Sequence, residues 1–158
     1  MQDFTRWEEY YLIEKLDLNV PVKVTVNNKI LWQATWEVNG VKFRFVAEND
    51  DDWEDEFPEW SITFWNMSTP SIFSSGSTDL TGDMGASSLK VFSGVASAFK
   101  KFIRVKKPQH FFFSAEEPSR VRLYNRLAKM IASEFHYKMM KDNDGSNTFY
   151  GFTKKYSS

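Results

Sequence analysis

A short glycine-containing segment carries the residue types and spacing that best suit ligand chemistry. It follows a polar loop and directly precedes a stretch with helical periodicity. Glycine lets a ligand approach the backbone closely, and the first turn of a helix offers free N–H groups at the positive end of its dipole. Such a turn can bind phosphate groups. The residues concerned are Thr81, Gly82, Gly85, Ala86 and Ser87.

The same segment has other interpretations. A P-loop would need a Gly-Lys-Ser/Thr run, which does not follow here, and a dinucleotide fingerprint would need more than the lone pair Gly82 and Gly85. A turn that only caps the helix through Ser87 or Ser88 also accounts for the pattern, and the segment taken alone favours it. The residues therefore leave both a phosphate site and a structural turn open.

Further along, Arg120, Arg122 and Tyr124 lie in a stretch that we expect to be helical. The phenol of Tyr124 is a neutral donor at pH 7 and can give a proton to a leaving group, while an arginine can neutralise phosphate charge. Tyr124 also falls on an apolar helical stripe, so a core aromatic is an equal alternative. A solvated helix face is favoured for Arg122. No general base is evident, although Glu59 or Asp79 could act through a water molecule.

These residues need strands and helices to position them. Alternating apolar and polar residues predict three consecutive antiparallel strands over Leu31–Val38, Val41–Ala47 and Glu59–Trp65, the first two joined by a tight turn at Asn39-Gly40. The acidic run Glu48–Glu56 lacks the glycine and ligand spacing of a calcium loop, so we expect a solvated hairpin loop there.

The second half of the chain alternates helices with strands. The first of these helices has an apolar face and basic residues at its C-terminal end, where the helix dipole favours cations. In chain order, the expected elements are a helix over Leu89–Ile103, a buried strand over His110–Ser114, a helix from Glu116 to Phe135, and a hairpin of Tyr137–Lys141 and Thr148–Lys154.

The N-terminal part contributes one more helix, which is amphipathic and spans Phe4–Leu16. Lys23–Val26 is either a short strand or part of a loop. The expected order is therefore α-β-β-β-α-β-α-β-β. We predict a single α+β domain over residues 1–158 with a mixed central sheet.

Composition excludes several kinds of site. The 158 residues include no Cys, which removes disulfides and thiolate metal sites, and two His are too few for a structural zinc site, so we expect no metal. His110 and His136 sit at element edges, where a structural role is favoured. No apolar run approaches the ~20 residues of a membrane helix, and the charged N-terminus does not resemble a signal peptide. We therefore expect a soluble, cytoplasmic protein with no membrane contact.

The net charge of −1 conceals a strong asymmetry. Residues 1–89 hold 6 Lys and Arg against 16 Asp and Glu, whereas residues 90–158 hold 14 against 5. A globally neutral chain is a poor general binder of nucleic acid, so we expect none. The basic half could hold a small phosphorylated ligand or meet a protein partner, or the two halves could simply attract each other within the fold. The oligomeric state is left open.

The order of elements and the glycine turn resemble the GNAT superfamily of acyl-CoA-dependent N-acetyltransferases, over roughly residues 31–155. In that family a turn of the pattern Arg/Gln-x-x-Gly-x-Gly/Ala opens a helix and holds the CoA pyrophosphate through backbone N–H groups. Gly82, Gly85 and Ala86 match this pattern with one extra residue in the middle and no leading Arg or Gln. Leu123-Tyr124 is similar to the family's Leu-Tyr pair.

The resemblance implies acetyl-CoA as the cofactor and an amine as the acceptor. The glycine turn would hold the pyrophosphate, and the strand that contains Ser114 would splay to admit the pantetheine arm. Arg120 would neutralise the remaining phosphate charge, and Tyr124 would protonate the leaving thiolate.

A catalytically inactive protein of the same fold, acting as a protein-interaction or structural module, is the alternative. The missing Arg or Gln, the altered glycine spacing and the absent base favour it. The segment Phe113–Tyr124 is also similar to part of uncharacterised bacteriophage proteins, which implies the cytoplasm of a host cell.

Overall fold

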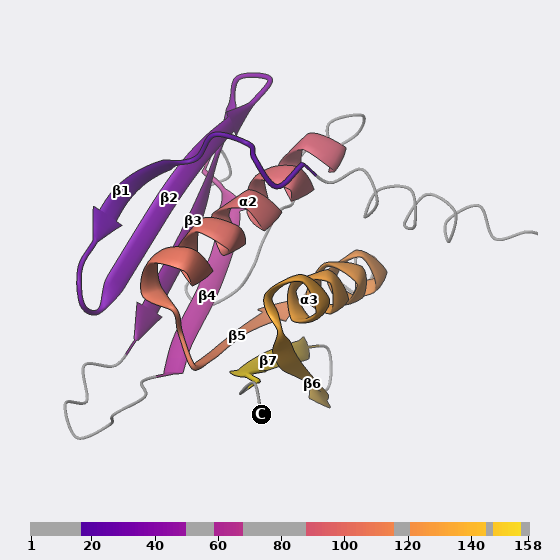
Figure 1. The fold of residues 1–158 in the computed structure, drawn as a ribbon. Helices are drawn as coiled ribbons and strands as arrows, with labels where there is room; N and C mark the ends of the chain where they lie inside the picture. Colours follow the sequence, from indigo (N-terminus) through magenta and orange to yellow (C-terminus); the bar gives the residue numbers. More distant parts are fainter. Residues whose placement is uncertain (1–16, 50–58, 68–87, 116–120, 145–146, 156–158) are drawn as a thin grey trace, which may run out of the picture.

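The chain folds into one sheet with two helices on one face, as described by a computed structural model for residues 17–49, 59–67, 88–115, 121–144 and 147–155 (Figure 1). The N-terminal helix expected over residues 4–16 lies outside these residues, as does most of the acidic run. The described elements are β1 (Lys23–Asn27), β2 (Leu31–Val38), β3 (Val41–Asn49), β4 (Glu59–Asn66), α2 (Ser88–Lys106), β5 (His110–Ala115), α3 (Val121–Phe135), β6 (Tyr137–Asp144) and β7 (Asn147–Lys154).

The seven described strands form one mixed sheet in the order β1-β2-β3-β4-β5-β7-β6. Each neighbouring pair is antiparallel except β4 and β5, which are parallel. This confirms the predicted α+β class with a mixed sheet. The described order adds β1 to the expected strands, which decides that Lys23–Val26 is a strand and not a loop; its pairing with β2 is irregular between Val24 and Val26.

The three predicted meander strands are confirmed as β2, β3 and β4. Val38 pairs with Val41, so Asn39 and Gly40 form a two-residue turn, and both have positive φ angles of 51° and 81°. Asn and Gly tolerate that backbone region, which is the one that a tight hairpin turn of matching twist requires. The local turn chemistry and the alternation of the strands therefore specify the same register.

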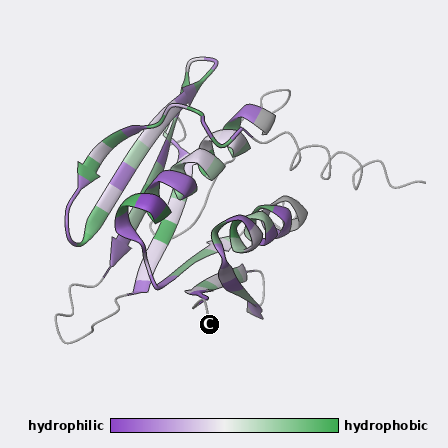
Figure 2. Cartoon of the chain, viewed as in Figure 1, coloured by the Kyte–Doolittle hydropathy of each residue, from purple (hydrophilic) through white to green (hydrophobic). Residues whose placement is uncertain are grey.

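Both helices cover the same face of the sheet (Figure 1). Helix α2 packs on β2 and β3, α3 packs on β6 and β7, and the two helices contact each other. Hydrophobic and hydrophilic residues alternate along both helices (Figure 2), as expected for amphipathic elements. The helix expected over Leu89–Ile103 continues to Lys106, and Lys107 follows it with a positive φ of 47°.

The core between the helices and the sheet consists largely of aromatic rings. Phe99 of α2 meets Phe45 of β3 edge to face at 4.9 Å, and Phe111 of β5 stacks on Phe152 of β7 at 4.7 Å. Such pairs add to the stabilisation that comes from burial alone. The prediction of a buried strand at β5 holds for its core face only, because Phe112 and Ser114 on its other face are half-buried.

Helix α2 lies directly against Trp36 of β2 at Gly94. A Cβ atom at this position would lie 2.0 Å from Nε1 of Trp36. The Trp36 ring is nearly fully buried and stacks on Phe43. Only a residue without a side chain therefore lets the helix backbone rest on this indole.

Candidate functional site

The parallel junction between β4 and β5 is short, and its end defines the candidate site. Three residue pairs form it, namely Glu59 with His110, Trp60 with Phe111, and Ser61 with Phe112. Beyond them β4 continues to Asn66 against β3, and β5 continues to Ala115 against β7. We call residues 62–66 and 113–115 the β4–β5 fork. Along the fork, β4 and β5 are no longer paired with each other.

Tyr124 lies on the core side of the fork. It stands near the start of α3 and is fully buried, with its ring 6.2 Å from that of Phe64 on β4 and 6.0 Å from that of Phe92 on α2. Phe64 in turn packs on Phe113 of β5, at 5.8 Å across the fork. Tyr124 therefore occupies a core position, which is one of the two alternatives that the sequence left open, and the other alternative, proton donation, stays a prediction.

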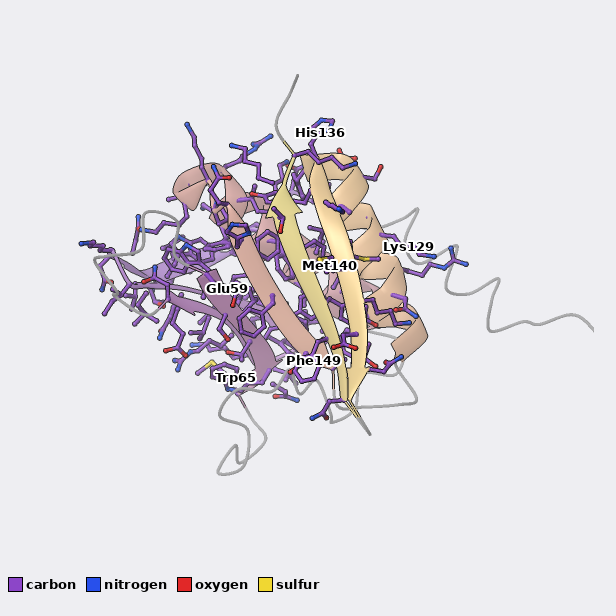
Figure 3. The ribbon with its side chains drawn as sticks, turned by 90° about the horizontal axis from the view of Figure 1, so that it is seen from below. Glu59, Trp65, Lys129, His136, Met140 and Phe149 are labelled. Atoms are coloured by element: carbon purple, nitrogen blue, oxygen red, sulfur yellow. The ribbon has the colours of Figure 1, made fainter. Side chains whose placement is uncertain are left out.

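The opposite face of the fork carries Ser114, which the sequence predicted, and two aromatic rings that sequence reasoning missed. Ser114 points to this face and pairs with Phe149 of β7, and Trp65 of β4 occupies the same face. All three are half-buried. Figure 3 labels Trp65 and Phe149 on strands on either side of β5. Side chains alternate between the two faces of a strand, so Trp65 and Phe149, next to the buried Phe64 and Tyr150, could have been assigned to this face from the sequence.

Most of the predicted phosphate-binding residues lie outside the described part of the chain. This applies to the turn itself and to the arginine at the start of the next helix. Helix α2 begins at Ser88, directly after the turn, and has no acidic residue in its first turn. The residues outside the description are Thr81, Gly82, Gly85, Ala86, Ser87 and Arg120.

The candidate general bases are not assembled around Tyr124. Glu59 is exposed at the paired end of the β4–β5 junction. It precedes Phe64 by five residues, or about 17 Å of strand, and points to the other face of the sheet. Asp79 lies outside the described residues.

The two histidines lie at element edges, as predicted. His110 begins β5, and its Nδ1 lies 3.2 Å from Oγ1 of Thr153 on β7. His136 is exposed between α3 and β6 with a positive φ of 62°. Neither residue lies at the fork.

Two buried tyrosines donate hydrogen bonds that hold α3 and the segment before β5 in place. The Tyr150 hydroxyl donates to Oδ1 of Asn125 at 2.7 Å, and the Tyr137 hydroxyl donates to the carbonyl of Pro108 at 2.6 Å. Burial raises the pKa of both tyrosines to about 12, so both remain neutral donors at ordinary pH. Because Asn125 directly follows Tyr124, the bond from β7 fixes the part of α3 that carries Tyr124.

No group of three or more metal-ligating side chains is found within the described ranges, and none of the helices described there is long and apolar enough to cross a membrane. No protein-family model, curated protein or solved structure matches this chain.

Proposed function

We propose that this protein binds an acyl-CoA thioester at the β4–β5 fork and transfers its acyl group to an amine. The observation that carries the proposal is the fork itself, where a parallel junction stops after three pairs although both strands continue. The resemblance of the sequence to the GNAT superfamily supports the proposal, because in that family the strand after the phosphate turn splays to admit pantetheine. The acceptor amine stays unspecified.

The fork offers groups that suit a pantetheine arm. That arm contains two amide groups, each of which needs both a donor and an acceptor. The strand backbones on the two sides of the fork would offer N–H and C=O groups at the spacing of an extended chain. The rings of Phe64 and Phe113 close the core side against water. The phosphates would be held by the glycine turn predicted from the sequence, which lies outside the described residues.

Coenzyme A would supply the acyl group as an activated thioester. Tyr124 would hold a proton on its phenol oxygen and donate it to the sulfur that leaves. Its buried position between Phe64 and Phe92 fixes the ring and keeps bulk water away from that proton. Ser114 and the half-buried rings of Trp65 and Phe149 would border the acceptor on the other face.

An inactive protein-interaction module of the same fold is the second candidate function. One observation favours it: Tyr124 is enclosed by aromatic rings, and Glu59 lies on the other face at the far end of β4. No acid–base pair is therefore assembled among the described residues at the fork. Such a module would bind a protein partner and need no acetyl-CoA.

Calorimetry with acetyl-CoA separates the two candidates. Binding to the wild type supports the first proposal, and Gly85→Val should abolish it, because a branched side chain blocks backbone approach to the pyrophosphate. Gly76→Val makes the same chemical change earlier in the same polar segment and should leave the affinity unchanged. A wild type that does not bind acetyl-CoA, and whose melting temperature acetyl-CoA does not raise, would refute the first proposal.

Tyr124→Phe then tests catalysis. Removing only the hydroxyl should lower turnover by about 100- to 10,000-fold at nearly unchanged acetyl-CoA affinity. The measurement is thiol release with a panel of amines and polypeptide N-termini. Tyr137→Phe removes a buried hydroxyl far from the fork and serves as the control. Unchanged turnover in the Tyr124 variant would exclude this residue from the mechanism.

A further inference from the structure

A basic groove lies on the C-terminal half of α2, away from the fork. It has a volume of about 530 Å³ and runs between the helix and residues 18–22, which lead into β1. Its lining includes Lys100, Lys101 and Arg104, and no acidic residue of the described chain lines it. Volumes of this size are typical of ligand sites.

The wall of the groove is held in place by a small hydrogen-bond network. The hydroxyl of Ser97 donates to the carbonyl of Asp17 at 2.9 Å and accepts from the N–H of Val20 at 3.0 Å. The N–H of Asp17 donates to the hydroxyl of Ser93 at 2.9 Å, and Nζ of Lys100 donates to Oδ1 of Asn19 at 2.9 Å. The groove is thus formed before any ligand binds, which reduces the ordering cost of binding.

Helix α2 carries more positive charge than a favourable interaction with its own dipole explains. The helix contains five basic residues and no acidic one. Cations in its last turn, Arg104 and Lys106, interact favourably with the helix dipole, but that effect fades beyond the last turn. Lys100 and Lys101 lie earlier, and Lys100 with Arg104 forms a like-charge pair at i and i+4, which is unfavourable in a helix. An anion in the groove would relieve that repulsion.

The lining indicates the shape of the ligand as well as its charge. Leu18, Val20, Val22 and Val105 add apolar surface beside the cations. Residues four apart in a helix are separated by about 6 Å along its axis. Alternate side chains of an extended peptide repeat at about 6.6 Å. Lys100 and Arg104 can therefore meet acidic side chains at every second position of an extended chain.

We propose that this groove binds an extended, acidic peptide segment of a partner protein. Carboxylates at alternate positions contact Lys100 and Arg104, and the apolar residues between them contact Val20, Val22 and Val105. The site is independent of the proposed acyl-CoA site, because Lys101 stands about 20 Å along α2 from Ser88.

The test uses the full chain and a labelled eight-residue peptide that alternates Glu with Val. Fluorescence polarisation should show binding, and the same peptide with Gln in place of Glu should bind at least tenfold more weakly. K100Q/R104Q should weaken the Glu peptide by about tenfold, since two exposed ion pairs contribute roughly threefold each. The control variant K138Q/K141Q removes the same amount of charge from the exposed part of β6 and should leave the affinity for the Glu peptide nearly unchanged.

A second variant tests the apolar wall. Val105 is 48% exposed, so Val105→Asp should leave the fold intact, as circular dichroism would show, and should abolish binding of the acidic peptide. The proposal would be overturned if the wild type did not bind the peptide, or if K100Q/R104Q and K138Q/K141Q lost affinity equally. Displacement of the peptide by inorganic phosphate or by single-stranded DNA, each at equal concentration, would also overturn it. Acetyl-CoA should not displace the peptide, whether or not it binds elsewhere.

Discussion

Gly94→Ala tests whether α2 rests on the indole of Trp36. In an exposed helix this change would stabilise the protein by about 1 kcal/mol, because alanine is the better helix former. Here the new Cβ would lie 2.0 Å from Nε1 and 2.3 Å from Cδ1 of Trp36. Restoring an ordinary contact of about 3.4 Å would require a shift of about 1.4 Å between helix and sheet. Trp36 cannot yield easily, because it is buried and stacked on Phe43.

Overpacking of this kind typically costs about 1–3 kcal/mol, so we expect Gly94→Ala to lower the free energy of unfolding by about 2 kcal/mol. Urea unfolding followed by circular dichroism measures the change. The decisive comparison is a double-mutant cycle with Trp36→Val, which removes the ring atoms that clash. In that background Gly94→Ala should be neutral or stabilising.

Gly151 provides the matched control. A Cβ atom there would meet its nearest neighbour, the carbonyl oxygen of Met140, at 3.9 Å, which is ordinary contact. Gly151→Ala should therefore be tolerated. If Gly94→Ala were as stable as the wild type, or equally destabilising with and without Trp36, then the helix would not be seated on this ring and our account of the α2–β2 packing would be refuted.

Two further predictions concern the turn and the buried tyrosines. Gly40 has a φ of 81°, and a Cβ atom added there would have no neighbour within 4 Å. Gly40→Ala should therefore lower the free energy of unfolding only by the backbone strain, about 1 kcal/mol, as measured from the urea midpoint. A loss above about 3 kcal/mol would contradict this. Burial raises the pKa of Tyr137 and Tyr150 from about 10 to about 12, so the folded state holds these protons more tightly than the unfolded state. Stability should therefore be retained below pH 10 and lost as the pH rises to 12, with a smaller loss in Y137F/Y150F.

Local patterns were sufficient to predict most of the fold. The meander depends on alternation and on Asn39-Gly40, and both signals lie within a few residues of each other. The β4–β5 junction is different, because no local signal says which strands become parallel neighbours. Only the resemblance to a known superfamily predicts that β5 splays from its neighbour, and that splaying stays a prediction.

The surroundings of the sites were harder to predict for the same reason. Alternation places Trp65 and Phe149 on one face, but only the strand order brings their strands to either side of β5. The sequence shows Ser93 and Ser97 only as small residues of an apolar helix. In the structure their hydroxyls hydrogen-bond to the segment that precedes β1, more than 70 residues away in the chain. Such roles depend on tertiary contacts that periodicity does not encode.

The short junction between β4 and β5 has a consequence for how the chain folds. It divides the sheet into β1–β4 and β5–β7–β6, and each part contains a hairpin of neighbouring strands. When these two parts of the sheet pair at Ser61 and Phe112, a loop of about 50 residues closes, and only three residue pairs form between the parts. Loop closure of that length carries an entropic cost that few contacts offset. We expect the two half-sheets to form first and the junction last, so that amide hydrogens at the junction exchange with solvent sooner than those of β3 or β7.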